Sequence, residues 1–411
     1  MIVGLLAMAR HSQGAILAKT RAGDSSLPMP AHNFWTAVHR YLGLATLVFL
    51  AIAAVTGCVL CVRGPLDRAL NPDLLRRAGP PIDAVAAVTA FQARTPGAQV
   101  ISFPLHVGAG GTLQVTVAPK AGGDDQVFLD GDGRVIGSRA TRAGWDRRHF
   151  VQGIYLLHYT LLGGTWGRWL MGVAALGWLI GAVVGLYLTL PARGPFWRNW
   201  LRAFAIRFKA RLARVLLDLH QATGLWLLLP VLVLAWTSVS MNFFDEAFTP
   251  AVQAVSPARP SPFDDGARPA ATSPGPPLGF AKAVDLATTR AHAQELAWRP
   301  AQAWVRPDLK LWGVAFTDSG VVNYSRLGPI AYVFDNAGDF VYEDNPYEDS
   351  AGRAVSRSLY PLHTGQMAGL AGRVFDFILG LVTFEQCVTG LYLWLKRRGP
   401  RIAAKRARAA V

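Results

Sequence analysis

Two stretches of the chain repeat each other: Tyr155-Leu-Leu-His158 and Tyr360-Pro-Leu-His363. A Gly-Arg pair follows each histidine by nine and ten residues, as Gly167-Arg168 and as Gly372-Arg373. A Gly-Leu-Tyr-Leu string then begins twenty-seven residues after each histidine. So many matches at fixed offsets indicate an internal repeat, and the repeat defines how the whole chain is divided.

The segments upstream of these stretches match as well. In each, a histidine is followed by glycine four residues on and by threonine seventeen residues on: His39, Gly43 and Thr56, and His220, Gly224 and Thr237. Each half therefore reads as helix, external domain, helix. Two spans in each half insert both halves the same way up, so we expect their pseudo-two-fold axis to run along the membrane normal.

Four apolar runs are long enough to cross a bilayer, which takes about 20 residues. They cover 41–62, 169–190, 221–244 and 374–395, in a chain that is 52% hydrophobic and 16% charged. Because backbone groups in lipid need internal partners, each run is predicted to be helical, although Pro230 interrupts the third. Glu385 lies inside the fourth run; it indicates either a proton path or a protonated acid that is hydrogen-bonded within the bundle.

The formal charge of +15 gathers beside the apolar runs, in the loop after the second run and in the tail after the fourth. The positive-inside rule places both segments, and both termini, in the cytoplasm. The long segments 64–148 and 245–356 then lie in the periplasm of a bacterium, and the protein in the inner membrane. No basic face of a folded domain indicates nucleic-acid binding.

The predicted fold is an α-helical integral membrane protein with four transmembrane helices, built as a duplicated helix–domain–helix unit with two α+β periplasmic domains. The segments are a cytoplasmic tail (1–33), first span (34–63), first domain (64–148), periplasmic approach and second span (149–190), basic loop (191–213), third span (214–244), Pro-rich linker and second domain (245–356), approach and fourth span (357–397), and basic tail (398–411). Each domain is predicted to have one helix, at 82–93 or 280–296, followed by strands that alternate apolar and polar residues.

Of the nine histidines, four occupy matched positions in the repeat. Topology puts His39 and His220 at the cytoplasmic face, and His158 and His363 at the periplasmic face. Six-coordinate haem takes two axial ligands from opposite sides, so the two same-side pairs predict two b-type haems. One alternative is that the histidines are amphipathic residues at the lipid headgroup boundary and bind no metal. The other is that all four bind one metal ion, which is disfavoured because the two pairs lie at opposite faces of the membrane.

Several other residues are candidates for the haem sites, for the bundle core or for partner contacts. Gly43 and Gly224 lie one turn from their histidines and would let a flat macrocycle approach. Arg168 and Arg373 are predicted to pair with haem propionates, or else to reach the lipid headgroups. Cys58 and Cys61 form a C-x-x-C motif and are interpreted as small core residues, with a redox pair as the alternative. The acidic group Glu343, Asp344, Glu348 and Asp349 is interpreted as a solvated loop, or else as a contact for a partner.

Several of these motifs resemble the PepSY-associated transmembrane family. They are His39-Arg-Tyr-Leu-Gly-Leu, Leu219-His-Gln-Ala-Thr-Gly-Leu225, and the stretch from Pro361-Leu-His-Thr-Gly365 to Gly390-Leu-Tyr-Leu-Trp-Leu-Lys396. The resemblance covers roughly residues 33–398, and the external domains look like PepSY domains. It implies a bacterial inner-membrane protein of the kind called iron-regulated membrane proteins. Some of these are haem-bearing reductases of ferric siderophores, with the four span histidines as ligands.

The function expected from these observations is electron transfer from the cytoplasmic haem to the periplasmic one and on to a ferric siderophore or another periplasmic acceptor. No dinucleotide fingerprint is present, so the donor would be a quinol or a cytoplasmic reductase. No catalytic residue is assigned. Two alternatives stay open: a non-enzymatic protein whose PepSY-like domains bind a periplasmic partner, and a transporter of iron chelates.

Overall fold

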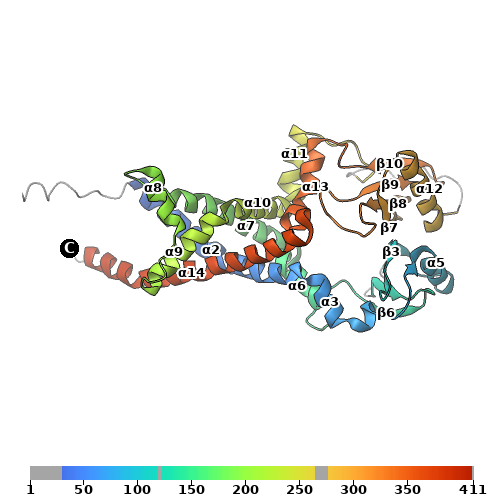
Figure 1. The fold of residues 1–411 in the computed structure, drawn as a ribbon, viewed down its shortest axis with the longest axis horizontal. Helices are drawn as coiled ribbons and strands as arrows, with labels where there is room; N and C mark the ends of the chain where they lie inside the picture. The colour runs from blue at the N-terminus through green and yellow to red at the C-terminus, as the bar shows by residue number, and fades with distance from the viewer. Residues whose placement is uncertain (1–29, 119–122, 264–275, 410–411) are drawn as a thin grey trace, which may run out of the picture.

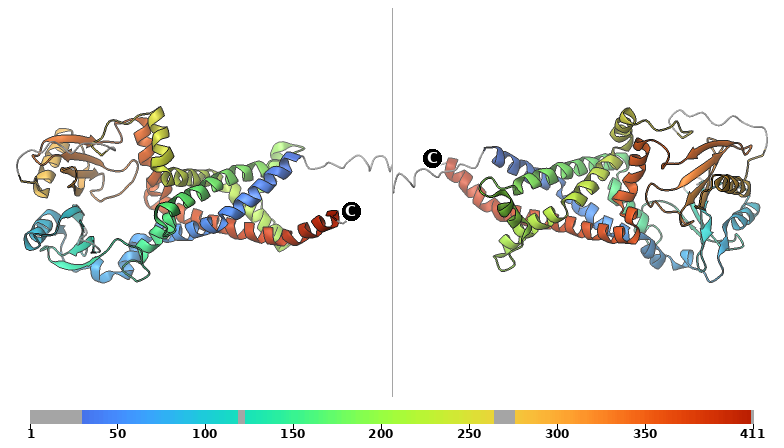
Figure 2. Two further views of the ribbon diagram at one scale, coloured as in Figure 1. Left: turned by 180° about the vertical axis from the view of Figure 1, so that it is seen from behind. Right: turned by 45° about the horizontal axis from the view of Figure 1, so that its top comes forward.

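The computed structural model describes residues 30–118, 123–263 and 276–409. Most of the predicted N-terminal tail and much of the Pro-rich linker therefore lie outside the described residues. Figure 1 shows an elongated molecule, with a bundle of helices at one end and two α+β domains side by side at the other. The described chain begins and ends at the bundle end that is remote from these domains, as the two further views agree (Figure 2).

The bundle contains three helices that are long and apolar enough to cross a membrane. They are α2 (Pro30–Cys61), α7 (Gly164–Thr189) and α14 (Gly369–Ala409). A fourth span arises when α9 (Leu212–Trp226) and α10 (Leu228–Asn242) are taken together. The prediction of a helical membrane protein with soluble α+β parts is confirmed at this level, with three to four candidate spans in the described chain.

The third predicted span is a broken helix, with an angle of 72° between α9 and α10. Pro230 is the physical cause, because its ring would clash with the carbonyl four residues back, at Trp226, and it has no N–H to donate. The helix stops at Trp226 and a new one starts at Leu228, so the proline falls in a first turn, where it is tolerated. The sequence predicted an interruption here, but not a bend of this size.

Small residues let the bundle helices approach closely, as is usual between membrane helices. A Cβ at Gly177 of α7 would lie 2.7 Å from Thr46 of α2, and one at Gly380 of α14 would lie 2.6 Å from the Cys58 sulfur. Cys58 is buried, and its thiol donates to the Phe377 carbonyl at 3.4 Å. The interpretation of Cys58 as a small core residue is therefore confirmed.

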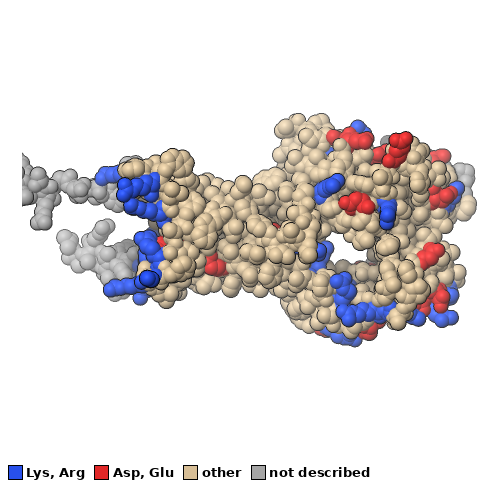
Figure 3. Space-filling model, in the orientation of Figure 1, with Lys and Arg blue, Asp and Glu red and all other residues tan. Residues whose placement is uncertain are grey.

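Basic residues collect at the bundle end that is remote from the domains (Figure 3). The loop after α7 lies there, with α8 (Phe196–Trp200) and the 3-10 helix η1 (Leu201–Phe204), and so does the last part of α14. The two segments with the largest charge surplus in the sequence thus lie at the same end of the molecule.

The first domain follows α2 and leads into α7. Its elements are α3 (Arg63–Leu70), α4 (Pro72–Leu75), β1 (Ile82–Asp83), α5 (Ala84–Arg94), β2 (Val100–Pro104), β3 (His106–Val107), β4 (Leu113–Val117), β5 (Gln126–Leu129), β6 (Val135–Arg139) and α6 (Phe150–Thr160). The second domain comprises the π-helix η2 (Phe244–Phe248), α11 (Thr249–Val255), α12 (Phe280–Ala293), β7 (Arg299–Arg306), β8 (Leu311–Thr317), β9 (Ile330–Phe334), β10 (Phe340–Asp344), α13 (Ala351–His363) and η3 (Gln366–Ala368). The predicted helices at 82–93 and 280–296 correspond to α5 and α12.

Eight strands of the two domains form one antiparallel sheet, in the order β10-β9-β8-β7-β2-β4-β5-β6, while β1 and β3 pair with each other in a separate two-stranded sheet. The domains join where β2 pairs with β7, with Phe103 opposite Ala303. Phe103 also packs edge-to-face on Phe280 of α12, at 4.9 Å between ring centroids. One apolar core therefore runs through both domains. The sequence predicted two domains but not this union, because the register across β2 and β7 depends on residues two hundred positions apart.

Gly313→Ala tests the packing beside this joint. Gly313 lies opposite Trp304, and a Cβ at Gly313 would lie 2.0 Å from the indole ring. Because the ring must move to admit a methyl group, we expect the free energy of unfolding of the sheet to fall by about 1–3 kcal/mol. Thermal unfolding of the full chain, followed by tryptophan fluorescence, measures this. Gly108→Ala is the control, since nothing lies within 4 Å of a Cβ there; equal melting of the two variants would contradict the prediction.

Candidate functional site

The four repeat-matched histidines meet in two pairs. His39 of α2 and His220 of α9 have ring centroids 6.4 Å apart, and His158 of α6 and His363 of α13 have centroids 6.2 Å apart. The first pair is the inner pair and the second, near the domains, is the outer pair. The structure thus brings together the same partners that the repeat and the topology had paired.

The separation of the rings suits a metal between them. A metal ion lies about 2 Å from each ligating imidazole nitrogen, so two rings on opposite sides of one ion have centres roughly 6 Å apart. Within the described residues no group of three or more His, Cys, Asp or Glu side chains could hold a bare metal ion. Two protein ligands per site match haem, because the macrocycle supplies the remaining four nitrogens.

Each of the four imidazoles makes a hydrogen bond through Nδ1. The partners are the Gly181 carbonyl for His39 (2.9 Å), Thr56 Oγ1 for His158 (2.9 Å), Thr389 Oγ1 for His220 (2.9 Å) and Thr237 Oγ1 for His363 (3.2 Å). Every bond crosses between two helices. The two outer bonds use the threonine that follows His39 or His220 by seventeen residues, so they occupy equivalent positions in the two halves.

The chemistry of these partners decides the tautomer of every ring. Each threonine hydroxyl already donates its one hydrogen to a carbonyl on its own helix: Thr56 to Ile52 (2.6 Å), Thr389 to Glu385 (2.8 Å), and Thr237 to Leu234 (3.0 Å). The hydroxyl can then only accept from the histidine, and the Gly181 carbonyl can only accept. All four rings therefore carry their proton on Nδ1 and keep the Nε2 lone pair for a ligand, the pattern found around metal-bound histidine.

The outer histidines are also held neutral. His158 and His363 lie in α6 and α13, which precede the candidate spans. Burial lowers the pKa of His158 to about 4. Burial, with a smaller effect of His158, lowers the pKa of His363 to about 3. Both rings are therefore uncharged at neutral pH, as a metal ligand must be.

Glycine stands beside three of the four rings. A Cβ would lie 3.1 Å from His39 Cε1 at Gly185, 3.3 Å from His158 Cε1 at Gly57, and 3.5 Å from His220 Cε1 at Gly390. Gly185 and Gly390 begin the repeated Gly-Leu-Tyr-Leu strings, so the strings supply room for the inner rings. Ser238 occupies the position that corresponds to Gly57 in the second half.

The inner pair borders a cavity of about 400 Å³, within the roughly 300–1,000 Å³ typical of small-molecule sites. Gly43 and Gly224, which the sequence singled out one turn from the inner histidines, line it together with Gly177 and Gly181. Arg40 and Arg397 line it too, and neither forms an ion pair with any described residue. Sequence reasoning missed these two arginines, although Arg40 directly follows His39.

The two arginines that were predicted to pair with haem propionates differ in whether a carboxylate already binds them. Arg168 pairs with Glu246 of η2 and donates to the Asn242 carbonyl at 2.8 Å, while Trp169 also donates to Glu246 at 2.7 Å. Its charge is thus already compensated by a carboxylate that sequence reasoning overlooked. Arg373 has no ion pair within the described parts of the chain. Of the two, only Arg373 keeps an uncompensated charge.

Two acidic groups have definite places. The Thr223 hydroxyl oxygen lies 2.9 Å from Glu385 Oε2 and 2.8 Å from the Leu219 carbonyl of its own helix, whereas Glu385 Oε1 is buried without a partner among the described residues. In the acidic group before α13, Asp344 binds both Arg353 (2.6 Å) and Arg357 (3.2 Å) and is mostly buried. The interpretation of that group as a solvated loop is therefore wrong for Asp344, because two arginines of α13 hold it against the domain.

A comparison with known families supports the membrane assignment. A family model described as the PepSY-associated TM region matches residues 36–397, nearly the whole chain. No curated protein matches the chain.

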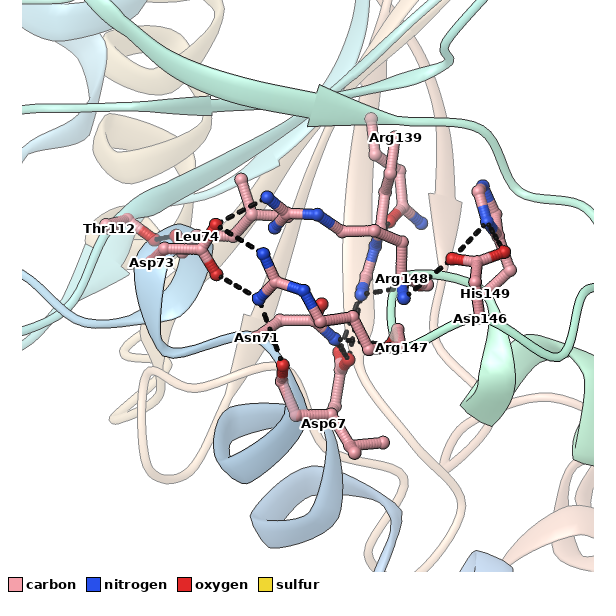
Figure 4. Close-up of polar contacts among 12 residues, drawn as sticks. Asp67, Asn71, Asp73, Leu74, Thr112, Arg139, Asp146, Arg147, Arg148 and His149 are labelled. Carbon is pink, nitrogen blue, oxygen red and sulfur yellow. Dashed lines mark hydrogen bonds and ion pairs between the residues drawn. The ribbon is translucent and has the colours of Figure 1, made fainter.

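The helix that carries His158 is tied to the first domain by a polar junction (Figure 4). Arg139 of β6 binds Asp67 of α3 through two hydrogen bonds of 2.8 Å. The Asn71 side chain, which is fully buried, donates to Asp67 (2.8 Å) and to the Arg147 carbonyl (3.0 Å). Arg147 in turn binds Asp73 at 2.7 Å. The junction thus fixes the start of α6 relative to the end of α2.

His149, which has no partner in the repeat, belongs to this junction (Figure 4). Its Nδ1 contacts the Asp146 carboxylate at 2.8 Å. His149 therefore makes a local contact just before α6 and belongs to neither histidine pair.

Asn71→Ala should weaken the junction. The change leaves the Arg147 carbonyl and one oxygen of Asp67 with fewer donors and removes the buried amide, at a cost of about 1–3 kcal/mol in stability. Limited proteolysis near residues 140–149 and thermal unfolding of the full chain measure the loss. Thr89→Ala, on the exposed face of α5, is the control and should leave both unchanged. A junction as resistant to protease in the Asn71 variant as in the native chain would argue against this role.

Proposed function

The chain belongs to the PepSY-associated transmembrane family, and from this premise we propose that it is a di-haem b electron-transfer protein of the bacterial inner membrane. The observation that carries the proposal is the set of four Nδ1 hydrogen bonds. They leave the lone pair of Nε2 available on two imidazoles at each of two places, with the ring separation that one iron requires.

We further propose that the domains are periplasmic and both termini cytoplasmic. The basic loop and tail lie together at the end remote from the domains, which supports this orientation under the positive-inside rule. The broken pair α9 and α10 then serves as the fourth span. Equivalent bonds from Thr56 to His158 and from Thr237 to His363 support the view that the two halves arose by duplication.

Bound between two imidazoles, haem supplies a one-electron carrier whose potential depends on its ligands and surroundings. The residues of the chain do the rest. Threonine hydroxyls and the Gly181 carbonyl orient the rings and raise their basicity. Arg40 and Arg397 at the inner cavity, and Arg373 at the other end, offer guanidinium groups to propionates.

The donor and the acceptor follow from this orientation. We place the donor on the cytoplasmic side, as a quinol or a cytoplasmic reductase, and the acceptor in the periplasm. We propose that the acceptor is a ferric siderophore. Addition of one electron converts Fe³⁺ to Fe²⁺, which binds hard oxygen ligands less strongly, so reduction would free the iron.

A transporter of iron chelates is the second candidate function, and one observation favours it. Glu385 Oε1 is buried in the bundle without a partner among the described residues. Carboxylates at such depth often belong to proton or ion paths. The same spectroscopic experiment separates the two functions.

The visible spectrum of the purified protein tests the haem proposal. We expect a Soret band and an α-band that appears on reduction with dithionite. His158→Ala should remove about half of the haem and His220→Ala the other half, because each variant destroys one two-ligand site. His106→Ala, exposed in the first domain, is the control. A protein purified from haem-replete cells without a Soret band would rule out this function.

Thr237→Val tests whether the hydrogen bond from His363 to Thr237 strengthens haem binding. Valine keeps the shape of threonine but offers no acceptor to the Nδ1–H of His363, and loss of such a partner typically weakens metal affinity by about 10–100-fold. Haem titration of the apoprotein should show this weakening at the outer site only. Thr160→Val is the matched control, since the hydroxyl of this buried residue donates to the Leu156 carbonyl of its own helix and to no other described group. Equal affinities of the two variants would contradict the prediction.

A further inference from the structure

Tyrosines stand at matched places beside the outer pair. Tyr155 precedes His158 by three residues, and Tyr360 precedes His363 by three. Residues three apart lie on the same face of a helix, so each tyrosine shares a face with its histidine. Tyr155 packs on Tyr159 at 4.8 Å between ring centroids, and its side chain is 37% exposed. These rings therefore border the outer pair and are accessible to a ligand.

A third tyrosine comes from the second domain. Tyr324, in the loop between β8 and β9, packs edge-to-face on Tyr360 at 5.2 Å and is 42% exposed. The loop is pinned close by: Arg357 donates to the Pro329 carbonyl at 3.1 Å, and Tyr347 donates to the Gly328 carbonyl at 3.1 Å. A soluble domain thus holds an aromatic ring at the edge of the bundle, beside the helix that ends at His363.

Positive charge borders the same place. The Arg63 guanidinium, at the start of α3, donates to Tyr360 Oη at 3.3 Å. Farther along, Arg68, Arg76 and Arg77 line an open cavity of about 560 Å³. Arg77 pairs with Asp130, but Arg63, Arg68 and Arg76 have no carboxylate partner in the described ranges.

The nearby acids do not cancel this charge, since Asp67 and Asp73 are bound to Arg139 and to Arg147 with Arg148. Figure 3 shows an opening between the bundle and the two domains, with Lys and Arg side chains on the side of the first domain and Asp or Glu side chains as well on the side of the second. The approach to the outer pair from the first domain is therefore electropositive.

Resting on the proposed function, we propose that Tyr155, Tyr324, Tyr360 and Arg63 form the docking surface for the electron acceptor, and that the acceptor is an anionic ferric chelate of the catecholate class. Catecholate ligands carry both negative charge and aromatic rings. Arginine attracts the charge, and tyrosine faces and edges bind the rings. A neutral hydroxamate chelate offers neither feature. On docking, one electron passes to Fe³⁺ and gives the Fe²⁺ chelate, with no bond formed to the protein.

The arrangement differs from an aromatic belt at the membrane surface. Belt residues place single rings at the headgroups. Here Tyr324 belongs to a soluble domain, and it contacts Tyr360 rather than standing alone. A belt role would leave chelate binding unchanged when Tyr324 is removed, so the two roles can be separated by experiment.

Binding of the gallium(III) tris-catecholate complex tests the surface without any redox step, since Ga³⁺ has the charge of Fe³⁺ and is not reduced. Titration of the full-length protein in nanodiscs should show saturable binding. Arg63→Gln and Tyr324→Ala should each weaken it by about tenfold, the effect of losing one contact to a charged group. Arg306→Gln is the control, because Arg306 pairs with Asp308 on the exposed β7–β8 turn. Unchanged binding in both test variants would overturn the docking proposal.

A second measurement connects docking with electron transfer. Dithionite-reduced protein is mixed with ferric tris-catecholate or with neutral ferric acetohydroxamate, and reoxidation is followed at the α-band. The two variants should raise the half-saturating concentration for the catecholate by about tenfold and leave that for the hydroxamate and the haem content unchanged. Equal shifts for both chelates would also overturn the proposal. If no haem is found, the proposed function fails, and the gallium titration still decides whether the docking surface exists.

Discussion

A buried Nδ1–H needs an acceptor, and four such bonds set the arrangement of this bundle. An imidazole in an apolar environment cannot leave its donor unsatisfied without a large free-energy cost. Three threonines and one carbonyl, all on neighbouring helices, supply the acceptors. Because each threonine hydroxyl has already donated to its own helix, the proton stays on the histidine. The same bonds therefore connect the helices, orient the rings and select the tautomer that can bind a metal.

Hydrogen bonds and ion pairs connect the α+β domains to the helices that carry the outer histidines. The junction around Asn71 ties the start of α6 to the end of α2, while the shared sheet holds the second domain against the first. Arg353 and Arg357 attach α13 to the second domain through Asp344. Both helices that carry the outer histidines are thus anchored in a common core.

Parts of the site could be predicted from sequence because repeats place residues at fixed offsets. The offsets paired His39 with His220 and His158 with His363, and they placed Gly43 and Gly224 one turn from the inner histidines. The assignment of Arg168 shows where such reasoning ends. A repeat reports which residues correspond, but not whether a charge is already compensated, and Glu246 lies on a helix that sequence patterns did not connect with Arg168.

The sequence by itself determined the candidate membrane spans, the basic end of the bundle and the partners within each histidine pair, because hydropathy, charge and repeat spacing are properties of the chain alone. Only the tertiary structure decided which threonines accept hydrogen bonds from the Nδ1–H groups, how sharply the helix turns before Pro230, and that β2 pairs with β7. These features depend on contacts between distant residues, such as Thr237 with His363, and on how tightly small residues let the helices pack.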